Sequence, residues 1–177
     1  MKQFNNGTIG KGFTLLEVII AIFIVTVGII STLLLITRTL AQTSISFSQL
    51  TAAYLTQEGI EIVRNIRDTN WIELTVDPNP PNSWDEGLTG CSTGCEADYI
   101  VTSQLDPTLS SYAGTFLKID GNGFYNYTSD TPTKFKRKIT INPDPGGDIL
   151  KVTVLVMWAE KGQTFYHTAQ ENLYRWR

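Results

Sequence analysis

Hydrophobic and polar positions change their period along the chain. Residues 13–38 are almost continuously apolar, and no charged residue lies between Glu17 and Arg38. This uncharged stretch of about 20 residues would span roughly 30 Å as a helix, which matches the hydrocarbon core of a bilayer. The pattern therefore predicts a membrane-spanning helix over residues 13–38.

A helical period continues beyond this apolar run. Between Thr39 and Asp68 there is no proline, and Gly59 is the only glycine. Glu61 and Arg64 form a favourable i,i+3 pair on a helix. We expect residues 39–68 to be the soluble half of one helix that ends near residue 66 and is about 80 Å long. Its apolar positions approximate helical spacing: Leu50, Ala53, Tyr54, Ile60, Ile62, Val63 and Ile66.

After a long connection, apolar and polar residues alternate with a period of two, as in a β-strand. Residues 69–98 are rich in Pro, Gly, Asn and Ser and predict a loop, which Trp71 and Trp84 would pin to the core. Alternating apolar residues then suit a half-buried antiparallel sheet over residues 99–177. The predicted fold is α+β, with the long helix packed on this sheet. Strands are expected at residues 99–104, 115–119, 123–127, 134–142, 149–158 and 164–174.

Composition and motifs narrow the function. The chain has 177 residues, 18% of them charged, and a net charge of -3, which argues against nucleic-acid binding driven by overall charge. No Ser-His-Asp signature, phosphate-binding loop or HExxH motif is present. The single histidine, His167, lies in a predicted strand and is interpreted as an ordinary surface or packed residue. We expect no enzymatic activity.

Cys91 and Cys95 are the only cysteines. If this region lies outside the cytoplasm, a disulfide between them is permitted, and so short a loop would contribute about 2 kcal/mol. Free thiols are one alternative. Half of a metal site is another, although the chain has no second Cys or His pair to complete it.

The predicted turns offer carboxylate and amide oxygens. Asp120 with Asn122, or Asp144 with Asp148, could supply the oxygen ligands that Ca²⁺ prefers. Asp and Asn are also common in turns because they form local hydrogen bonds. We expect no cofactor, with calcium as the alternative.

Residues 134–138, KFKRK, form a basic stretch with one aromatic residue. The stretch could contact DNA or another anionic polymer. We interpret it instead as an edge strand, in which lysines discourage aggregation.

The start of the apolar run, Gly12-Phe13-Thr14-Leu15-Leu16-Glu17-Val18, resembles the type III signal of type IV prepilins and type II secretion pseudopilins. The resemblance implies the pilin fold. It implies that a membrane prepilin peptidase cleaves after Gly12, which makes residues 1–12 a leader, and methylates the new amine of Phe13. Thr14 and Glu17 would then take part in assembly. The segment AIFIVTVGI is similar to PilV-type minor pilins and to I-type pseudopilins, and AAYLTQEGIE is similar to PilV-like proteins. The resemblance to pilins implies that residues 69–98 are the αβ-loop.

Glu17 has a physical interpretation of its own. A carboxylate at membrane depth costs at least about 2.5 kcal/mol and usually marks function. After cleavage, the ammonium of Phe13 would lie one helical turn away, so Glu17 could pair with it in the same chain or in an adjacent subunit. The alternative is a Glu near the membrane surface whose side chain reaches water.

These observations favour a structural subunit of a type IV pilus-like filament. Major pilins of the family that the motif resembles commonly carry a helix-kinking proline, and none lies between Phe13 and Asp77. By this resemblance, a minor subunit is favoured. Expected partners are prepilin peptidase, other pilin or pseudopilin subunits, an inner-membrane assembly platform and membrane lipid. The alternatives are a type II secretion pseudopilin and a tip subunit that binds DNA or a surface.

Lys2 and Lys11 precede the apolar run and predict a single-pass protein of the cytoplasmic membrane with its N-terminus inside. The rest of the chain would lie outside, later in a cell-surface or periplasmic filament. An ordinary secretory signal fits less well, because its apolar region would be shorter, about 7–15 residues, and its cleavage site would follow that region.

Overall fold

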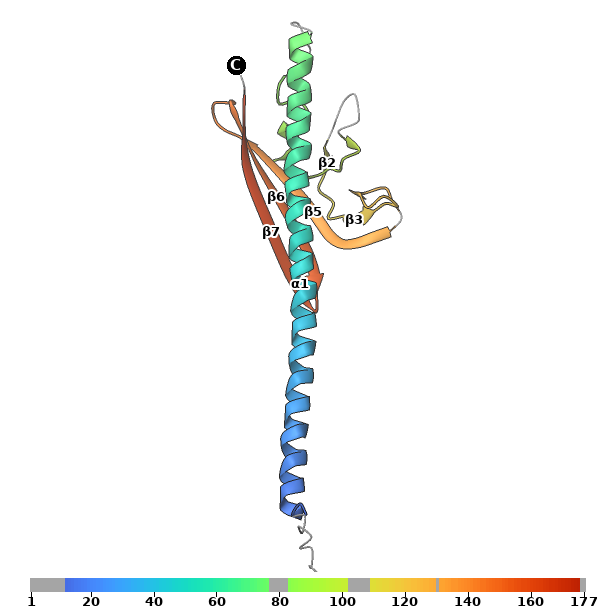
Figure 1. The fold of residues 1–177 in the computed structure, drawn as a ribbon. Coiled ribbons are helices and arrows are strands. Elements are labelled where there is room, and N and C mark those ends of the chain that lie inside the picture. Colours follow the sequence, from blue (N-terminus) through green and yellow to red (C-terminus); the bar gives the residue numbers. More distant parts are fainter. Residues whose placement is uncertain (1–11, 77–82, 102–108, 130, 176–177) are drawn as a thin grey trace, which may run out of the picture. The chain divides into compact units, whose positions relative to one another are not determined.

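The computed structural model describes residues 12–76, 83–101, 109–129 and 131–175. Contacts divide the chain into two units, Met1–Ser44 and Ile45–Arg177. One continuous helix, α1 (Leu15–Val76), runs through both units (Figure 1). The second unit also contains a 3₁₀ helix, η1 (Thr89–Cys91), and a seven-stranded antiparallel sheet.

Helix α1 is longer than the sequence predicted. It ends at Val76, so the prediction that residues 69–76 belong to a loop was wrong. These residues contain no Gly or Pro, and the first proline after Phe13 is Pro78. The buried Asn70 is a further reason, because its amide nitrogen donates to the carbonyl oxygens of Trp84 and Glu86, at 3.2 and 3.0 Å.

The two tryptophans take different places. Trp84 is buried in the loop, as expected, whereas Trp71 lies on α1 and packs against the core from the helix. Leu50 and Tyr54 were among the apolar positions with helical spacing in the sequence, but both side chains are exposed. The core-facing positions of α1 begin instead at Ser48, Ala52 and Leu55.

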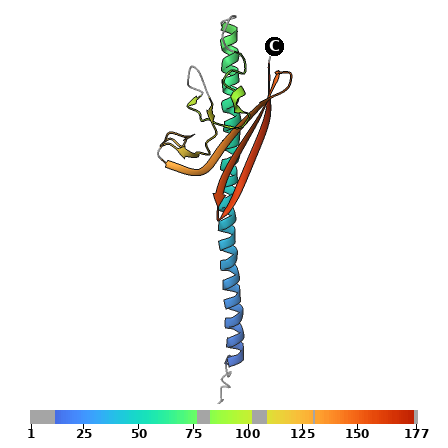
Figure 2. The same ribbon diagram turned by 180° about the vertical axis from the view of Figure 1, so that it is seen from behind.

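The sheet is organised around its longest strand. Strand β5 pairs with β1 and β3 on one side and with β6 on the other, and β6 in turn pairs with β7. The three long strands β5, β6 and β7 follow one another as a meander beside α1 (Figures 1 and 2). The strands are β1 (Cys95–Glu96), β2 (Ser110–Ser111), β3 (Phe116–Ile119), β4 (Tyr125–Asn126), β5 (Thr131–Pro143), β6 (Ile149–Glu160) and β7 (Gln163–Tyr174).

The expected strands at residues 115–119, 123–127, 134–142, 149–158 and 164–174 correspond to β3 to β7 and are confirmed. The strand expected at residues 99–104 was wrong for residues 99–101, which form a turn, and its remainder lies outside the described residues. The turn forms because the carboxylate of Asp98 accepts the N–H groups of Ile100 and Tyr127, at 3.1 and 2.9 Å. The short strands β1 and β2 were not predicted.

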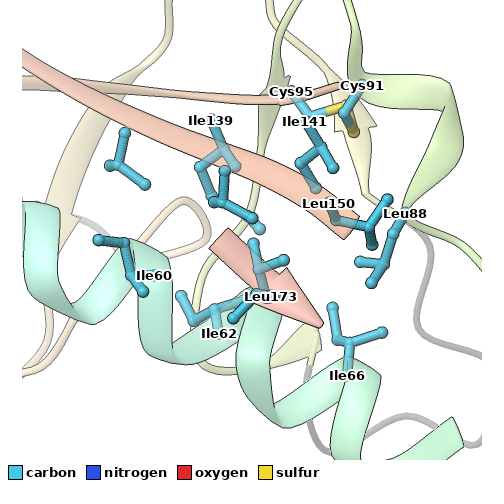
Figure 3. Close-up of a cluster of buried hydrophobic side chains, with 14 of the residues drawn as sticks. Ile60, Ile62, Ile66, Leu88, Cys91, Cys95, Ile139, Ile141, Leu150 and Leu173 are labelled. Carbon is cyan, nitrogen blue, oxygen red and sulfur yellow. A yellow bond between two sulfur atoms is a disulfide. The ribbon is translucent and has the colours of Figure 1, made fainter. Parts of the chain in front are cut away.

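The core lies between α1 and the inward face of the sheet (Figure 3). Alternate residues of β5 and β6 are buried, as the period of two predicted. Each fully buried Val, Leu or Ile stabilises the fold by about 1.5–3 kcal/mol. The main cluster includes Ile62, Val63 and Ile66 of α1 and Ile139, Ile141, Val152, Val154 and Leu173 of the sheet. A second cluster contains Ala52, Leu55, Leu117, Phe135, Val156 and Trp158.

Candidate functional site

The residues predicted for processing and assembly lie together at the start of α1. Gly12, Phe13 and Thr14 precede the helix, and Thr14 caps its first turn. The hydroxyl oxygen of Thr14 accepts the N–H of Glu17 at 3.3 Å, and its carbonyl oxygen accepts the same N–H at 3.1 Å. Thr-x-x-Glu is the pattern of a capping box. The cap therefore places Glu17 in the first helical turn, where the helix dipole favours a negative charge.

The segment around the predicted cleavage position is open. Apart from its two chain neighbours, no atom of the described residues lies within 4 Å of the position where Gly12 would carry a Cβ. The side chain of Phe13 is 81% exposed. Both residues on the two sides of the predicted cleavage position are therefore exposed.

The first half of α1 is apolar around its whole circumference and exposed on every side from Phe13 to Leu40. A helix that is hydrophobic all round needs an apolar environment. Among the described residues, α1 is the one helix long and apolar enough to cross a membrane.

The polar side chains of this segment satisfy their hydrogen bonds within the helix. The hydroxyl groups of Thr26, Ser31 and Thr32 donate to the carbonyl oxygens four residues earlier, at 2.7, 2.8 and 2.9 Å. Such internal pairing is what a helix in lipid requires. Glu17 is then the one acidic or basic side chain of the segment before Arg38.

A second group of polar residues holds α1 on the sheet. Arg64 on α1 donates to both carboxylate oxygens of Glu171 on β7, each at 2.6 Å. It also contacts Glu61, the predicted i,i+3 partner, at 2.5 Å. The hydrogen bond from Glu171, with the charges of both carboxylates, raises the pKa of Arg64 above its usual value. Both bonds to Glu171 come from one nitrogen, Nη2, while Nη1 donates to Glu61. Hydrogen bonds between charged groups are roughly twice as strong as neutral ones, so they help to hold α1 on β7.

The remaining candidate residues of the sequence have structural surroundings. Cys91 and Cys95 are joined in a disulfide whose Cα atoms lie 5.3 Å apart, within the main core cluster. His167 lies on β7, as predicted, and its Nδ1 is 3.1 Å from the hydroxyl of Thr56 on α1.

The turn carboxylates bond to their own turns. Asp120 accepts the N–H groups of Asn122 and Phe124, at 2.8 and 2.9 Å. Asp144 accepts those of Ile149 and Gly146, at 2.8 and 3.2 Å. Asp148 lies 3.9 Å from a nitrogen of Arg175. In the described ranges, no three His, Cys, Asp or Glu side chains converge as metal ligands would.

The basic stretch at residues 134–138 is not an edge strand, and that interpretation was wrong. It belongs to β5, which is paired on both sides. Its basic side chains also differ in burial. Arg137 is fully buried, whereas Lys136 and Lys138 lie on the opposite face of the strand. Sequence reasoning missed Tyr112 and Phe116, whose rings lie against those two lysines. No local pattern could have found them, because strand pairing brings them there.

Comparison with known proteins bears on the start of α1. Residues 10–33 match the family model of the prokaryotic N-terminal methylation motif. Neither curated proteins nor solved structures gave a significant match. The matched residues include Gly12, Phe13, Thr14 and Glu17 and extend over much of the exposed apolar helix. This motif, at the head of a long helix that packs on an antiparallel sheet, is the arrangement expected of a type IV pilin-like protein.

Proposed function

We propose that the chain is a minor structural subunit of a type IV pilus-like filament. In this proposal, prepilin peptidase cleaves after Gly12 and methylates the amine of Phe13, and the subunit assembles through the first half of α1. The observation that carries the proposal is the methylation motif at residues 10–33, set on an exposed apolar helix with Glu17 as its one charge before Arg38.

In this proposal, cleavage after Gly12 creates the charged partner that the carboxylate of Glu17 needs. Removal of residues 1–12 would create an ammonium at Phe13, about one helical turn from Glu17. In a medium of low dielectric constant, each charge needs a partner. Pairing with the adjacent subunit would fix the axial register of packed helices, as a buried polar residue does in a coiled coil. The Thr14 cap supports this role because it fixes where the helix begins.

The same chemistry would serve a type II secretion pseudopilin, which is the alternative. The minor role is supported by the lack of proline in α1, since major pilins commonly carry a helix-kinking one. Partners would be prepilin peptidase, other pilin-like subunits and the inner-membrane assembly platform. The N-terminus would face the cytoplasm, and the second unit would lie outside.

The assembly role can be tested by changing Glu17 alone. Glu17→Gln keeps the size of the side chain and removes its charge, so we expect normal membrane insertion and loss from the filament fraction sheared off cells. Thr26→Val is a matched control, because it removes a polar group from the same segment that is already satisfied within the helix. Normal incorporation of Glu17→Gln into filaments would contradict the proposed register role.

A further inference from the structure

The face of β5, β6 and β7 that points away from α1 carries lysines and no carboxylate. Strand β5 contains no Asp or Glu. Strands β6 and β7 contain one each, Glu160 and Glu171, and both bond to side chains of α1 on the helix side of the sheet. Lys136 and Lys138 alternate with buried residues of β5 and therefore lie on the outer face.

In the part of the chain that the structure describes, these two lysines contact aromatic rings and no carboxylate. The Nζ of Lys136 lies 4.3 Å from the ring centroid of Phe116, and that of Lys138 lies 5.4 Å from the ring centroid of Tyr112. Over the described ranges of the chain, neither lysine forms an ion pair with a carboxylate. A contact with an aromatic face positions an ammonium but leaves its positive charge in place.

Strand pairing extends this arrangement into a row across the sheet. Phe116 on β3 pairs with Lys136 on β5, which pairs with Met157 on β6, which pairs with Tyr166 on β7. Phe116 is 47% exposed and Tyr166 is 62% exposed. With strands about 4.8 Å apart, the two rings stand roughly 14 Å from each other across the outer face.

A shallow cavity of about 310 Å³ lies along this row from Phe116 to Met157. Its walls include the rings of Tyr112 and Phe116, the side chain of Lys136, and Met157 and Thr164. Lys134 also lines it, but its Nζ is paired with Glu160 at 2.8 Å, so the free positive charge of the cavity is that of Lys136. The cavity therefore combines apolar, aromatic and cationic groups. Its volume is at the low end of what small-molecule sites have, about 300–1,000 Å³.

We propose that this outer face binds single-stranded nucleic acid. Exposed rings beside ammonium groups that pair with no described carboxylate match the two chemistries of a single strand. Bases stack on aromatic side chains, and phosphates bind ammonium groups. Lys136 and Lys138 are two residues apart on one strand face, about 7 Å, so both can contact the same backbone. A duplex hides the faces of its bases, and a polyanion without rings would leave Phe116 and Tyr166 without a role.

The net charge of -3 does not oppose this site, because the outer face is locally cationic. It does mean that binding is weak and depends strongly on salt. The site is separate from the start of α1, so this function goes beyond assembly and does not depend on it.

The test is fluorescence anisotropy of a short labelled oligothymidylate with the full-length chain in detergent micelles. Binding should appear at low salt and weaken with a slope near -0.7 in log K against log salt for each phosphate contact. Lys136→Gln should reduce the magnitude of that slope by about 0.7. The control is Lys151→Gln, which removes a charge from the same sheet face about 20 Å along β6 and should leave the slope unchanged.

The aromatic part has its own matched pair of variants. Tyr166→Thr should weaken binding about tenfold through loss of one stacking platform. Tyr174→Thr, on the same face of β7 but eight residues further along, should have no effect. Absence of binding at low salt would overturn the proposal. Equal binding of duplex DNA, or equal competition by polyglutamate, would also overturn it. Because the assay needs no filament, failure of assembly would not be mistaken for failure of this site.

Discussion

Arg137 connects more parts of the second unit than its place in a basic stretch suggests. Its guanidinium is fully buried and lies 3.1 Å from a carboxylate oxygen of Glu58 on α1. It also donates to the carbonyl oxygens of Leu55, at 3.2 Å, and Ala97, at 2.6 Å. One side chain thus joins the helix, the central strand and the loop. A buried charge of this kind specifies geometry and is costly to disrupt.

Replacing Arg137 with Ala should lower the free energy of unfolding by about 3–5 kcal/mol, because Glu58 and two carbonyl oxygens lose their partner. Unfolding of the second unit can be followed by tryptophan fluorescence in denaturant, with the full-length chain in detergent. Lys151→Ala is the control, since Lys151 is exposed on the same sheet. Equal stability of Arg137→Ala and the unchanged chain would refute the structural role.

The carboxyl group of Asp144 makes the stability of the fold depend on pH in the acidic range. The N–H groups of Ile149 and then Gly146 hold the pKa of its carboxyl below the usual 3.8. The folded state therefore binds fewer protons than the unfolded state around and below that pH. The stabilisation is present above pH 3.8 and is lost as the pH falls through the lower folded pKa.

Asp144→Asn keeps an acceptor oxygen and cannot titrate. Its unfolding midpoint should therefore depend less on pH than that of the unchanged chain over the window around and below pH 3.8. The measurement is the midpoint of thermal unfolding at a series of acidic pH values. Identical pH dependence in both proteins would show that this carboxyl has the same pKa folded and unfolded.

At the scale of elements, the close approach of α1 to the sheet depends on Gly59. A Cβ at this position would lie 2.8 Å from Cγ1 of Val154 and 3.1 Å from Cδ of Arg137. Glycine inside a helix costs about 0.5–1 kcal/mol relative to alanine, so a packing reason is needed for it here. The reason is that β5 and β6 meet the helix at this residue.

Gly59→Ala should therefore destabilise the second unit in spite of its better helix propensity. Overpacking costs typically about 1–3 kcal/mol, which exceeds the gain in propensity. Val154→Ala removes the clashing methyl groups, so the double variant should lose less stability than the sum of the single ones, with a coupling of at least about 0.5 kcal/mol. Chemical denaturation of all four proteins gives this coupling, and strict additivity would contradict the close approach.

At the scale of the whole molecule, local sequence patterns predicted most helices and strands but did not predict the contacts between them. The period of two in β5 and β6 and the apolar run of α1 are properties of contiguous residues, so the sequence contained them. The start of α1 could be predicted for the same reason, since Gly12 to Glu17 form one short motif. The end of the helix could not, because the hydrogen bonds of Asn70 to residues 84 and 86 come from the loop.

The order in which the strands pair could not be predicted from the sequence either. Alternating lysines suggested an edge strand, but β5 is central and turns Arg137 into the core towards Glu58, 79 residues earlier in the chain. The row from Phe116 to Tyr166 is likewise made by four strands, and no window of the sequence contains it. Contacts between residues far apart in the sequence therefore determine the place of β5 in the sheet and the surroundings of its basic residues.

The central claim is that the start of α1 is a processing site, and intact-mass measurement tests it most directly. The chain should be purified from cells that contain an active prepilin peptidase. We expect a mature protein that begins at Phe13 and carries one additional methyl group on its N-terminal amine. Gly12→Lys, which puts a long charged side chain at the cleavage position, should leave the leader attached. Recovery of the unchanged chain with Met1 to Gly12 still in place would contradict the account.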